Sequence, residues 1–368
     1  MSRILKILIA LTVLFMCSVV VLGVGLFVVS NGDPVNYVRV ELIRLSLSGR
    51  EEELQNRPSS DTTPIRFTIP VGATPRVVAN QLYAQGLIRD EDLFVDYVRA
   101  NNLDIEIEAG TFFLNRSQNI PEIAVAITDT RNSQFAFRIL EGWRMEEIAN
   151  VIDQNPYFGF SGQDFLAVVG AGAQIEQGFI DYVGLPAGAS LEGFLFPDTY
   201  QLPADVTPVQ LRSILLNTFM ENVGSDLYTQ ALQQGFTLRE MVALGSIIQR
   251  EAVHADEHTM ISSAYRNRLA IGMNLDADPT VQYGIGFENG SWWPQITQAD
   301  YREAISPYNT YINAGLPPGP IASPGISAIR AAINPESTDF YYFRADCSGN
   351  GYHNFARTFE EHLANGCS

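Results

Sequence analysis

The sequence predicts an α+β protein with a single N-terminal transmembrane helix. Three observations lead to this fold class. The chain opens with a run of uncharged, mostly apolar residues at 7–30. A β-turn-α pattern then occurs twice, at residues 69–82 and 139–152. From residue 156 onward, amphipathic helical spacing dominates and apolar strands are few and short, which indicates an α-rich domain with minor strands.

Residues 7–30 are predicted to be a membrane anchor. An apolar helix of this length spans the roughly 30 Å hydrocarbon core with some tilt. Arg3 and Lys6 precede the run and the next basic residue is Arg39, so the positive-inside rule places residues 1–6 in the cytoplasm and the rest outside. A cleaved signal peptide is the alternative, but the run is long for one and no A-x-A-like site follows it.

The composition excludes several partners and chemistries. A formal charge of −18 and a pI near 4.6 argue against nucleic acid or an anionic membrane surface as the partner. Lys6 is the only lysine, which excludes a Schiff-base or P-loop lysine from the part outside the membrane. Cys347 and Cys367 lack the C-x-x-C spacing of a metal site and are candidates for a disulfide, which would stabilise the fold by roughly 3 kcal/mol.

Residues 31–63 are expected to form a stalk, and residues 64–155 a small α/β subdomain with an internal repeat. Each copy is predicted to be a strand, a glycine turn and a short helix. The alternative to a true duplication is a chance match, because such β-turn-α units are common. Units of this size resemble LysM modules, which bind glycans of N-acetylated sugars. The matched positions are Ile69, Gly72, Val78, Ala79, Asn80 and Leu82, and then Ile139, Gly142, Ile148, Ala149, Asn150 and Ile152.

Residues 156–368 are expected to form the catalytic domain, and Glu251 is its most informative residue. Thr237 and Glu240 have capping-box spacing, which predicts a helix that begins there and ends near Glu251. Glu251 falls on the apolar stripe of this helix. Burial and the negative helix end both raise the pKa of a carboxyl, as a general acid at neutral pH requires. A structural glutamate paired with Arg250 or Arg266 is the alternative.

Several loops combine aromatic residues with Asn, Gln, Thr and Asp, a mixture suited to a sugar. Together with the helix around Glu251 they resemble the YceG-like family of endolytic murein transglycosylases. The resemblance covers about residues 64–365. Ser323 departs from it, because we expect Asn there. The motifs are LEGFLFPDTY (191–200), LGSIIQREA (244–252), NRLAIGM (267–273), DADPTVQYG (276–284), YNTY (308–311), GLPPGPIASPG (315–325) and GYHNF (351–355).

The resemblance implies that Glu251 is the catalytic acid and base for cleavage between N-acetylmuramic acid and N-acetylglucosamine, leaving a 1,6-anhydro end. It implies no cofactor and no metal. The expected partners are peptidoglycan glycan strands, the inner membrane through residues 7–30, and peptidoglycan synthases. Four residues are candidates for positioning the substrate: Glu192, Asp278, Gln282 and Asn309.

Besides lysozyme-like hydrolysis of the same bond, with Glu192 or Asp278 as the partner of Glu251, two other functions remain open from the sequence. His254, Glu257 and His258 match the H-x-x-E-H pattern of a zinc peptidase, although such a short pattern arises easily in an acidic chain. A non-catalytic glycan-binding scaffold is the second alternative. No G-x-S-x-G elbow is present, which disfavours a serine hydrolase.

Overall fold

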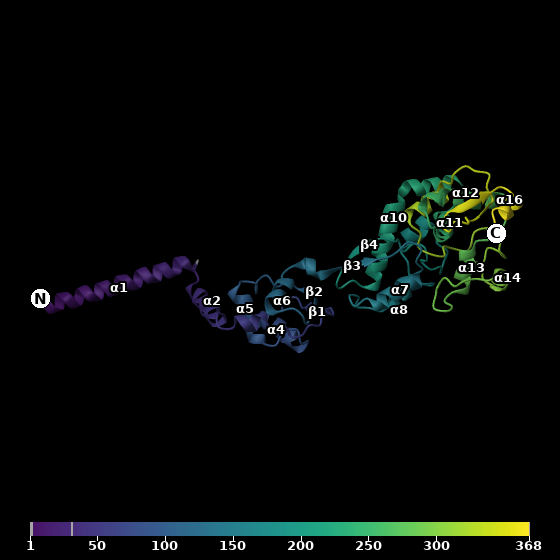
Figure 1. Cartoon of the computed structure of the whole chain (residues 1–368). Helices are drawn as coiled ribbons and strands as arrows, with labels where there is room; N and C mark the ends of the chain where they lie inside the picture. The colour runs from purple at the N-terminus through teal and green to yellow at the C-terminus, as the bar shows by residue number, and fades with distance from the viewer. Residues whose placement is uncertain (1–2, 31, 368) are drawn as a thin grey trace. The chain divides into compact units, whose positions relative to one another are not determined.

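The computed structural model describes residues 3–30 and 32–367. Residues 1–2 of the expected cytoplasmic tail, residue 31 of the expected stalk and residue 368 lie outside this description. The chain divides into two compact units, Met1–Gln134 and Phe135–Ser368. Both combine helices with a few short strands, which agrees with the α+β class. Figure 1 traces the order of the elements along the chain.

The first unit begins with the apolar helix α1 (Arg3–Val29). Within the described residues, its segment Leu11–Val29 is the one stretch long and apolar enough to cross a membrane. Asp33 then caps α2 (Pro34–Leu47) by accepting a hydrogen bond from the backbone of Asn36. The short helix α3 (Glu51–Gln55) follows, so the expected stalk contains two helices.

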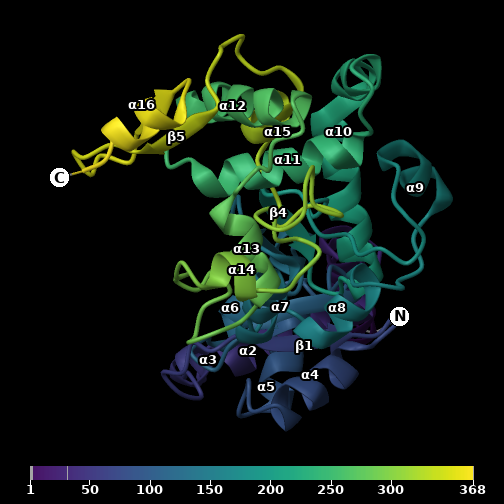
Figure 2. The ribbon, with the colours of Figure 1, turned by 90° about the vertical axis from the view of Figure 1, so that its right-hand side faces the viewer.

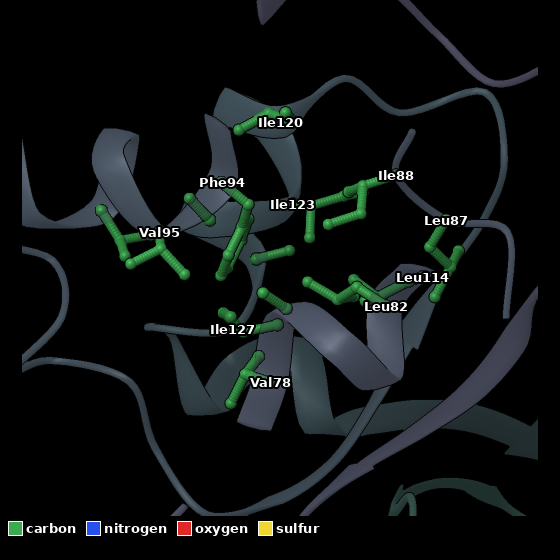
Figure 3. Close-up of a cluster of buried hydrophobic side chains, with 14 of the residues drawn as sticks. Val78, Leu82, Leu87, Ile88, Phe94, Val95, Leu114, Ile120, Ile123 and Ile127 are labelled. Carbon is green, nitrogen blue, oxygen red and sulfur yellow. The ribbon is translucent and has the colours of Figure 1, made fainter. Parts of the chain in front are cut away.

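The remainder of the first unit surrounds an apolar core. Strand β1 pairs antiparallel with β2, and Phe67 lies opposite Phe112 in this pairing. Figure 3 shows side chains from three different helices and from β2 pointing toward one another in this core. The elements are β1 (Ile65–Ile69), α4 (Pro75–Ala84), α5 (Glu91–Ala100), β2 (Gly110–Leu114), α6 (Ile120–Ala126) and η1 (Thr130–Ser133).

The two copies of the repeat lie in different units. The chain divides after Gln134, earlier than the boundary we expected at residue 155. The second copy comprises β3 (Gln134–Arg138) and α7 (Met145–Gln154), and β3 pairs with β4 (Thr199–Pro203) of the second unit. Both glycine turns adopt positive φ, +76° at Gly72 and +80° at Gly142, where a side chain would be strained.

The second unit is built around helix α11. Figure 2 shows α11 between neighbouring helices, and α10, α12 and α15 all pack against it. Gly245 allows the approach of α15, because a Cβ there would lie 3.3 Å from the Cα of Ile329. The helices are α8 (Gly162–Val169), α9 (Gln177–Val183), α10 (Pro208–Gln233), α11 (Leu238–Glu251), η2 (Ala255–Glu257), α12 (His258–Ala270), α13 (Asp278–Ile285), α14 (Asp300–Glu303), α15 (Ile326–Ile333) and α16 (Phe359–Ala364).

A hairpin of β5 (Tyr342–Ala345) and β6 (His353–Ala356) precedes α16. Cys347 and Cys367 form a disulfide with their Cα atoms 5.3 Å apart. The bridge joins Cys347, in the turn between β5 and β6, to Cys367, which follows α16. The segment from the hairpin turn to the end of α16 is therefore closed into a covalent loop.

Candidate active site

Glu251 is the last residue of α11, at the point where the helix leaves the core. The predicted capping box begins this helix: the Thr237 hydroxyl accepts a hydrogen bond from the Glu240 amide at 3.2 Å, and the Glu240 carboxylate accepts one from the Thr237 amide at 2.7 Å. Every residue from Met241 to Ile248 is buried. The helix therefore presents the Glu251 carboxyl from a rigid support.

The Glu251 carboxyl opens into a cleft of about 710 Å³ in the second unit. Carboxylates lie on one side of the cleft lining, in α11, in the segment before α13 and at the start of α13. The β5–β6 hairpin and α16 supply another part. The lining residues are Glu251, Tyr265, Arg268, Leu275, Asp276, Asp278, Gln298, Tyr301, Tyr311, Tyr342, Phe343, Arg344, Ala345, His353, Phe359 and His362.

The surroundings of Glu251 favour its protonated form near neutral pH. Burial raises the pKa of Glu251 to about 7, and the negative charge of Asp278 acts in the same direction. The hydroxyl of Tyr265 donates a hydrogen bond to the carboxyl at 2.7 Å, and this bond lowers the pKa, as do the charges of Arg268 and Arg250. Glu251 is thus able both to give and to take a proton at physiological pH.

Tyr265 and Arg268 lie one turn apart on α12 and face the cleft. Tyr265 is 1% exposed, and its ring packs edge-on against Phe343 at 5.4 Å. Burial raises the pKa of Tyr265 well above its usual range, so it remains a hydrogen-bond donor. Arg268 donates to the backbone carbonyls of Leu275 and Tyr341 at 2.5 and 2.6 Å and pairs with Asp276 at 3.5 Å.

Asp278 lies at the start of α13 and is the one of the four substrate-binding candidates that lines this cleft. It accepts a hydrogen bond from the Tyr311 hydroxyl at 2.6 Å. The Tyr311 ring stacks on Tyr301, with their centroids 4.2 Å apart. Two stacked rings beside a carboxylate provide a surface for the apolar face of a sugar and an acceptor for its hydroxyls.

The other three candidates lie outside the cleft lining. Asn309 is fully buried and donates to the carbonyls of Tyr301 and Ala304, so it shapes the loop that carries Tyr301. Gln282 donates to the carbonyl of Pro294 at 2.8 Å. Glu192 is 2% exposed and accepts from the amide of Met145 at 3.2 Å. Their contacts are with the protein itself.

The 244–252 and 315–325 motifs hold elements around the cleft in place through hydrogen bonds. The buried Ser246 hydroxyl accepts a hydrogen bond from the Ile321 amide, which docks the 315–325 loop on α11. Ser323, which replaces the expected Asn, exchanges backbone hydrogen bonds with Gly142 and Trp143, each at 2.8 Å. The second glycine turn of the repeat is therefore attached to the loop that packs against α11.

Arg250 and Arg266, the two arginines that could have paired with a structural Glu251, contact other groups. Arg250 stacks its guanidinium over Trp293, 3.9 Å from the ring centroid. Arg266 donates to the carbonyl of Ala332 and to the side chain of Gln234. Tyr265, rather than an arginine, is the residue that contacts the Glu251 carboxyl.

The three residues of the zinc pattern bind different partners. His254 contacts the carbonyl of Asn350 at 2.8 Å, and His258 contacts the hydroxyl of Ser327 at 3.1 Å. Glu257 accepts hydrogen bonds from the amide and the ring of His353, both at 2.9 Å. Among residues 3–30 and 32–367, no cluster of His, Cys, Asp and Glu forms a metal site, and the geometry does not support a zinc peptidase.

Sequence reasoning missed Tyr265, Tyr301, Arg344 and His362. Arg268 was quoted only as part of the 267–273 motif. These residues come from four separate elements and follow no shared spacing. The one available signal was the Tyr265–Arg268 pair, a polar and aromatic i, i+3 couple on the helix that carries this motif.

The chain is similar to known proteins over most of its length. A family model described as the YceG-like family matches residues 67–366. An endolytic murein transglycosylase of Bacillus subtilis (strain 168) is 30% identical over 316 residues, which is 82% of this chain and 83% of the relative. A protein of the same name from Streptococcus pneumoniae serotype 2 is 28% identical over 81% of this chain, which spans only 57% of that relative.

A solved structure shows the same fold. The crystal structure of a yceG-like protein from Listeria monocytogenes superimposes with a TM-score of 0.56 at 28% sequence identity. The match covers 82% of this chain and 98% of the Listeria chain. Fold and sequence similarity therefore extend through both described units rather than through the surroundings of Glu251 alone.

Proposed function

This chain belongs to the YceG-like family, and we propose that it is an endolytic lytic transglycosylase that cleaves the bond between N-acetylmuramic acid and N-acetylglucosamine in peptidoglycan. One observation carries the proposal: a carboxyl whose pKa is raised to about 7 opens into a cleft lined by tyrosines and carboxylates. The names of the curated relatives agree with this reaction.

In the first step, protonated Glu251 acts as the general acid. It gives its proton to the glycosidic oxygen as the bond from that oxygen to the muramyl C1 breaks. Positive charge then develops on C1 and the ring oxygen. The Asp278 carboxylate lies in the same cleft and favours this charge electrostatically. The Tyr265 hydroxyl stabilises the Glu251 carboxylate that the proton leaves behind.

In the second step, the same carboxylate acts as the base. It takes the proton of the muramyl 6-hydroxyl while the 6-oxygen attacks C1, which closes the 1,6-anhydro ring. Glu251 returns to its protonated state and no water is consumed. A second carboxylate is therefore not needed as a nucleophile or to activate water, unlike in most glycoside hydrolases. A pKa near 7 suits a group that must perform both transfers.

The apolar helix of the first unit favours a location of this reaction at the membrane. We infer that α1 anchors the chain in the inner membrane with residues 1–6 in the cytoplasm, since Arg3 and Lys6 precede the apolar run. Residues 64–155 would act as a LysM-like glycan-binding part, because both copies of the repeat have the expected turn and helix. An enzyme held there would cut nascent strands beside the peptidoglycan synthases.

Product analysis of Glu251→Gln tests the proposal. The full-length chain in detergent is incubated with purified peptidoglycan, and the products are identified by mass spectrometry. The wild type should release fragments with 1,6-anhydro ends, and Glu251→Gln should release none while still binding the glycan. Binding without release by the wild type would instead establish a non-catalytic scaffold. Ends carrying ¹⁸O from labelled water would establish a hydrolase.

A further inference from the structure

The hairpin side of the cleft carries positive charge. Strand β5 places Arg344 in the cleft lining, opposite Asn354 in the β5–β6 register. Helix α16 contributes His362 to the same lining. Figure 2 shows β5 and α16 together beside α12, and all three pack against one another through β5. Besides Glu251, the acidic residues of the lining are Asp276, which precedes α13, and Asp278, which begins it.

Arg344 differs from the other arginines near it. Arg268 pairs with Asp276 at 3.5 Å, and Arg357 pairs with Asp339 at 2.7 Å. Within residues 3–30 and 32–367, Arg344 has no carboxylate within ion-pair distance and its guanidinium donates no hydrogen bond. It is only partly exposed. In a chain with 41 acidic and 23 basic residues, an arginine in a cleft without an acidic neighbour is unexpected.

His362 lies close enough to this charge to respond to it. Burial lowers the pKa of His362, and the positive charges of Arg344 and Arg268 lower it further. The ring is therefore neutral at pH 7 and serves as a hydrogen-bonding group. Its Nδ1 atom is buried and has no hydrogen-bond partner in the part of the chain that the structure describes. The lining of this part of the cleft thus contains a cation without an acidic partner and a histidine with a buried, unsatisfied nitrogen.

The guanidinium of Arg344 lies against the end of the chain. A Cβ added at Gly366 would lie 3.0 Å from its Nη1 atom, so an alanine there would press on the guanidinium. The neighbouring Cys367 is bonded to Cys347 in the hairpin turn. The disulfide and the hairpin pairing hold the backbone on both sides of Arg344, so the side chain reaches the cleft from a fixed strand.

We propose that Arg344 and His362 form a subsite for a carboxylate carried by the muramyl residue of the glycan. This inference rests on the proposed function, which supplies a glycan as the ligand of the cleft. Two sources provide the same chemistry: the lactyl carboxylate of a strand without peptides, and a carboxylate of an attached stem peptide. Arginine is suited to either, because its planar donors match a carboxylate.

Binding measurements with soluble oligosaccharides test the subsite independently of turnover. The full-length chain in detergent carries Glu251→Gln to stop cleavage, and isothermal titration gives the dissociation constant. Three probes are compared: a GlcNAc–MurNAc tetrasaccharide with stem peptides, the same sugar with free lactyl carboxylates, and the latter converted to neutral methyl amides. Arg344→Gln is compared with Arg344→Lys, and Arg330→Gln on the exposed face of α15 is the charge-matched control.

Arg344→Gln should weaken binding of one carboxylate-bearing probe about tenfold and leave the neutral probe unchanged. Arg344→Lys should have a smaller effect, and Arg330→Gln none. The affected probe identifies the source of the carboxylate. Gly366→Ala should cause a smaller loss for the same probe, because it shifts the guanidinium only slightly and leaves its charge unchanged. If Arg344→Gln left the affinity of every probe unchanged, or weakened the neutral probe as much as the carboxylate-bearing ones, the subsite would be overturned. Absence of anhydro products from the wild type would instead contradict the proposed function.

Discussion

Glu251 and Glu192 are both carboxyl groups of the second unit with a raised pKa, and they differ in what they face. Burial raises the pKa of each: that of Glu251 to about 7, and that of Glu192 well above its usual range, with Glu146 adding to the effect. Glu251 opens into the cleft, whereas Glu192 is 2% exposed and accepts its hydrogen bond from the Met145 amide at the start of α7.

The comparison shows that a raised pKa does not by itself identify a catalytic acid. Glu192 lies beside Arg144, whose guanidinium is stacked 4.1 Å from the ring centre of Tyr283 and is itself buried. This polar cluster is closed by its own side chains. Glu251 faces a cleft that a ligand can enter and Glu192 does not, so access to the cleft separates the proposed catalytic group from the structural one.

The largest expected effect is the difference in turnover between the two glutamine variants. Glu251→Gln removes general acid–base catalysis and should lower the rate of anhydro-product release by about 10²–10⁴-fold. Glu192→Gln keeps the size of a side chain that lies outside the cleft and should keep the rate within about threefold. Release is followed by chromatography of the soluble fragments. Equal losses in the two variants would show that Glu192 takes part in the reaction.

The second effect concerns stability and its pH dependence. Because the pKa of Glu251 is raised from 4.5 to about 7, the folded state retains the proton over a range in which the unfolded state has lost it. Stability therefore falls as pH rises from about 4.5 to 7, by about 3 kcal/mol for this group. Glu251→Gln should be more stable than the wild type at pH 8 and close to it at pH 4.5. Urea denaturation at both pH values measures the difference; a constant difference would contradict the raised pKa.

The third effect sharpens the role of the Tyr265 hydrogen bond. This bond lowers the pKa of Glu251, so Tyr265→Phe should raise that pKa and shift the alkaline limb of the pH–rate profile upward. The maximal rate should fall about tenfold, because the carboxylate formed in the first step loses a donor. An unshifted limb with a reduced rate would indicate that Tyr265 acts only by packing against Phe343.

The smallest expected effect concerns the stacked tyrosines in the cleft of Glu251. The stacked pair Tyr301 and Tyr311 lines the cleft of Glu251. Tyr301→Leu removes a stacking surface and should raise KM about fivefold while changing kcat little. Tyr283→Leu, in the closed cluster around Glu192, should leave KM unchanged. Steady-state kinetics on a soluble glycan compares the two. A larger KM effect for Tyr283→Leu would place substrate at the closed cluster.

The helix that carries Glu251 was predictable because its signals are local. The Thr237–Glu240 capping box and the apolar stripe through Met241 and Ile248 depend only on residues within a few turns of one another. The apolar run at residues 7–30 and the glycine turns of the repeat are local in the same sense. These features specified helices, turns and an apolar N-terminal segment without knowledge of the tertiary structure.

The residues around Glu251 were not predictable in this way. Tyr265, Tyr311 and Arg344 reach the cleft from α12, a loop and β5, and no periodicity links them. The sequence did not distinguish Asp278, which lines the cleft, from Glu192, Gln282 and Asn309, which contact the protein itself. All four lie in motifs of similar polarity, and only packing determines which side chain meets solvent.

The sequence alone thus determined the helix that carries Glu251, its terminal carboxyl and the family to which the chain is similar, since each follows from residues adjacent along the chain. The tertiary structure decided which partner the carboxyl has, that the second β-turn-α copy pairs with β4, and that Arg344 shares the cleft. These are contacts between residues far apart in sequence. They form only when the apolar faces of α10, α11, α12 and α15 pack together, and a proton's free energy depends on the charges and dielectric that this packing sets.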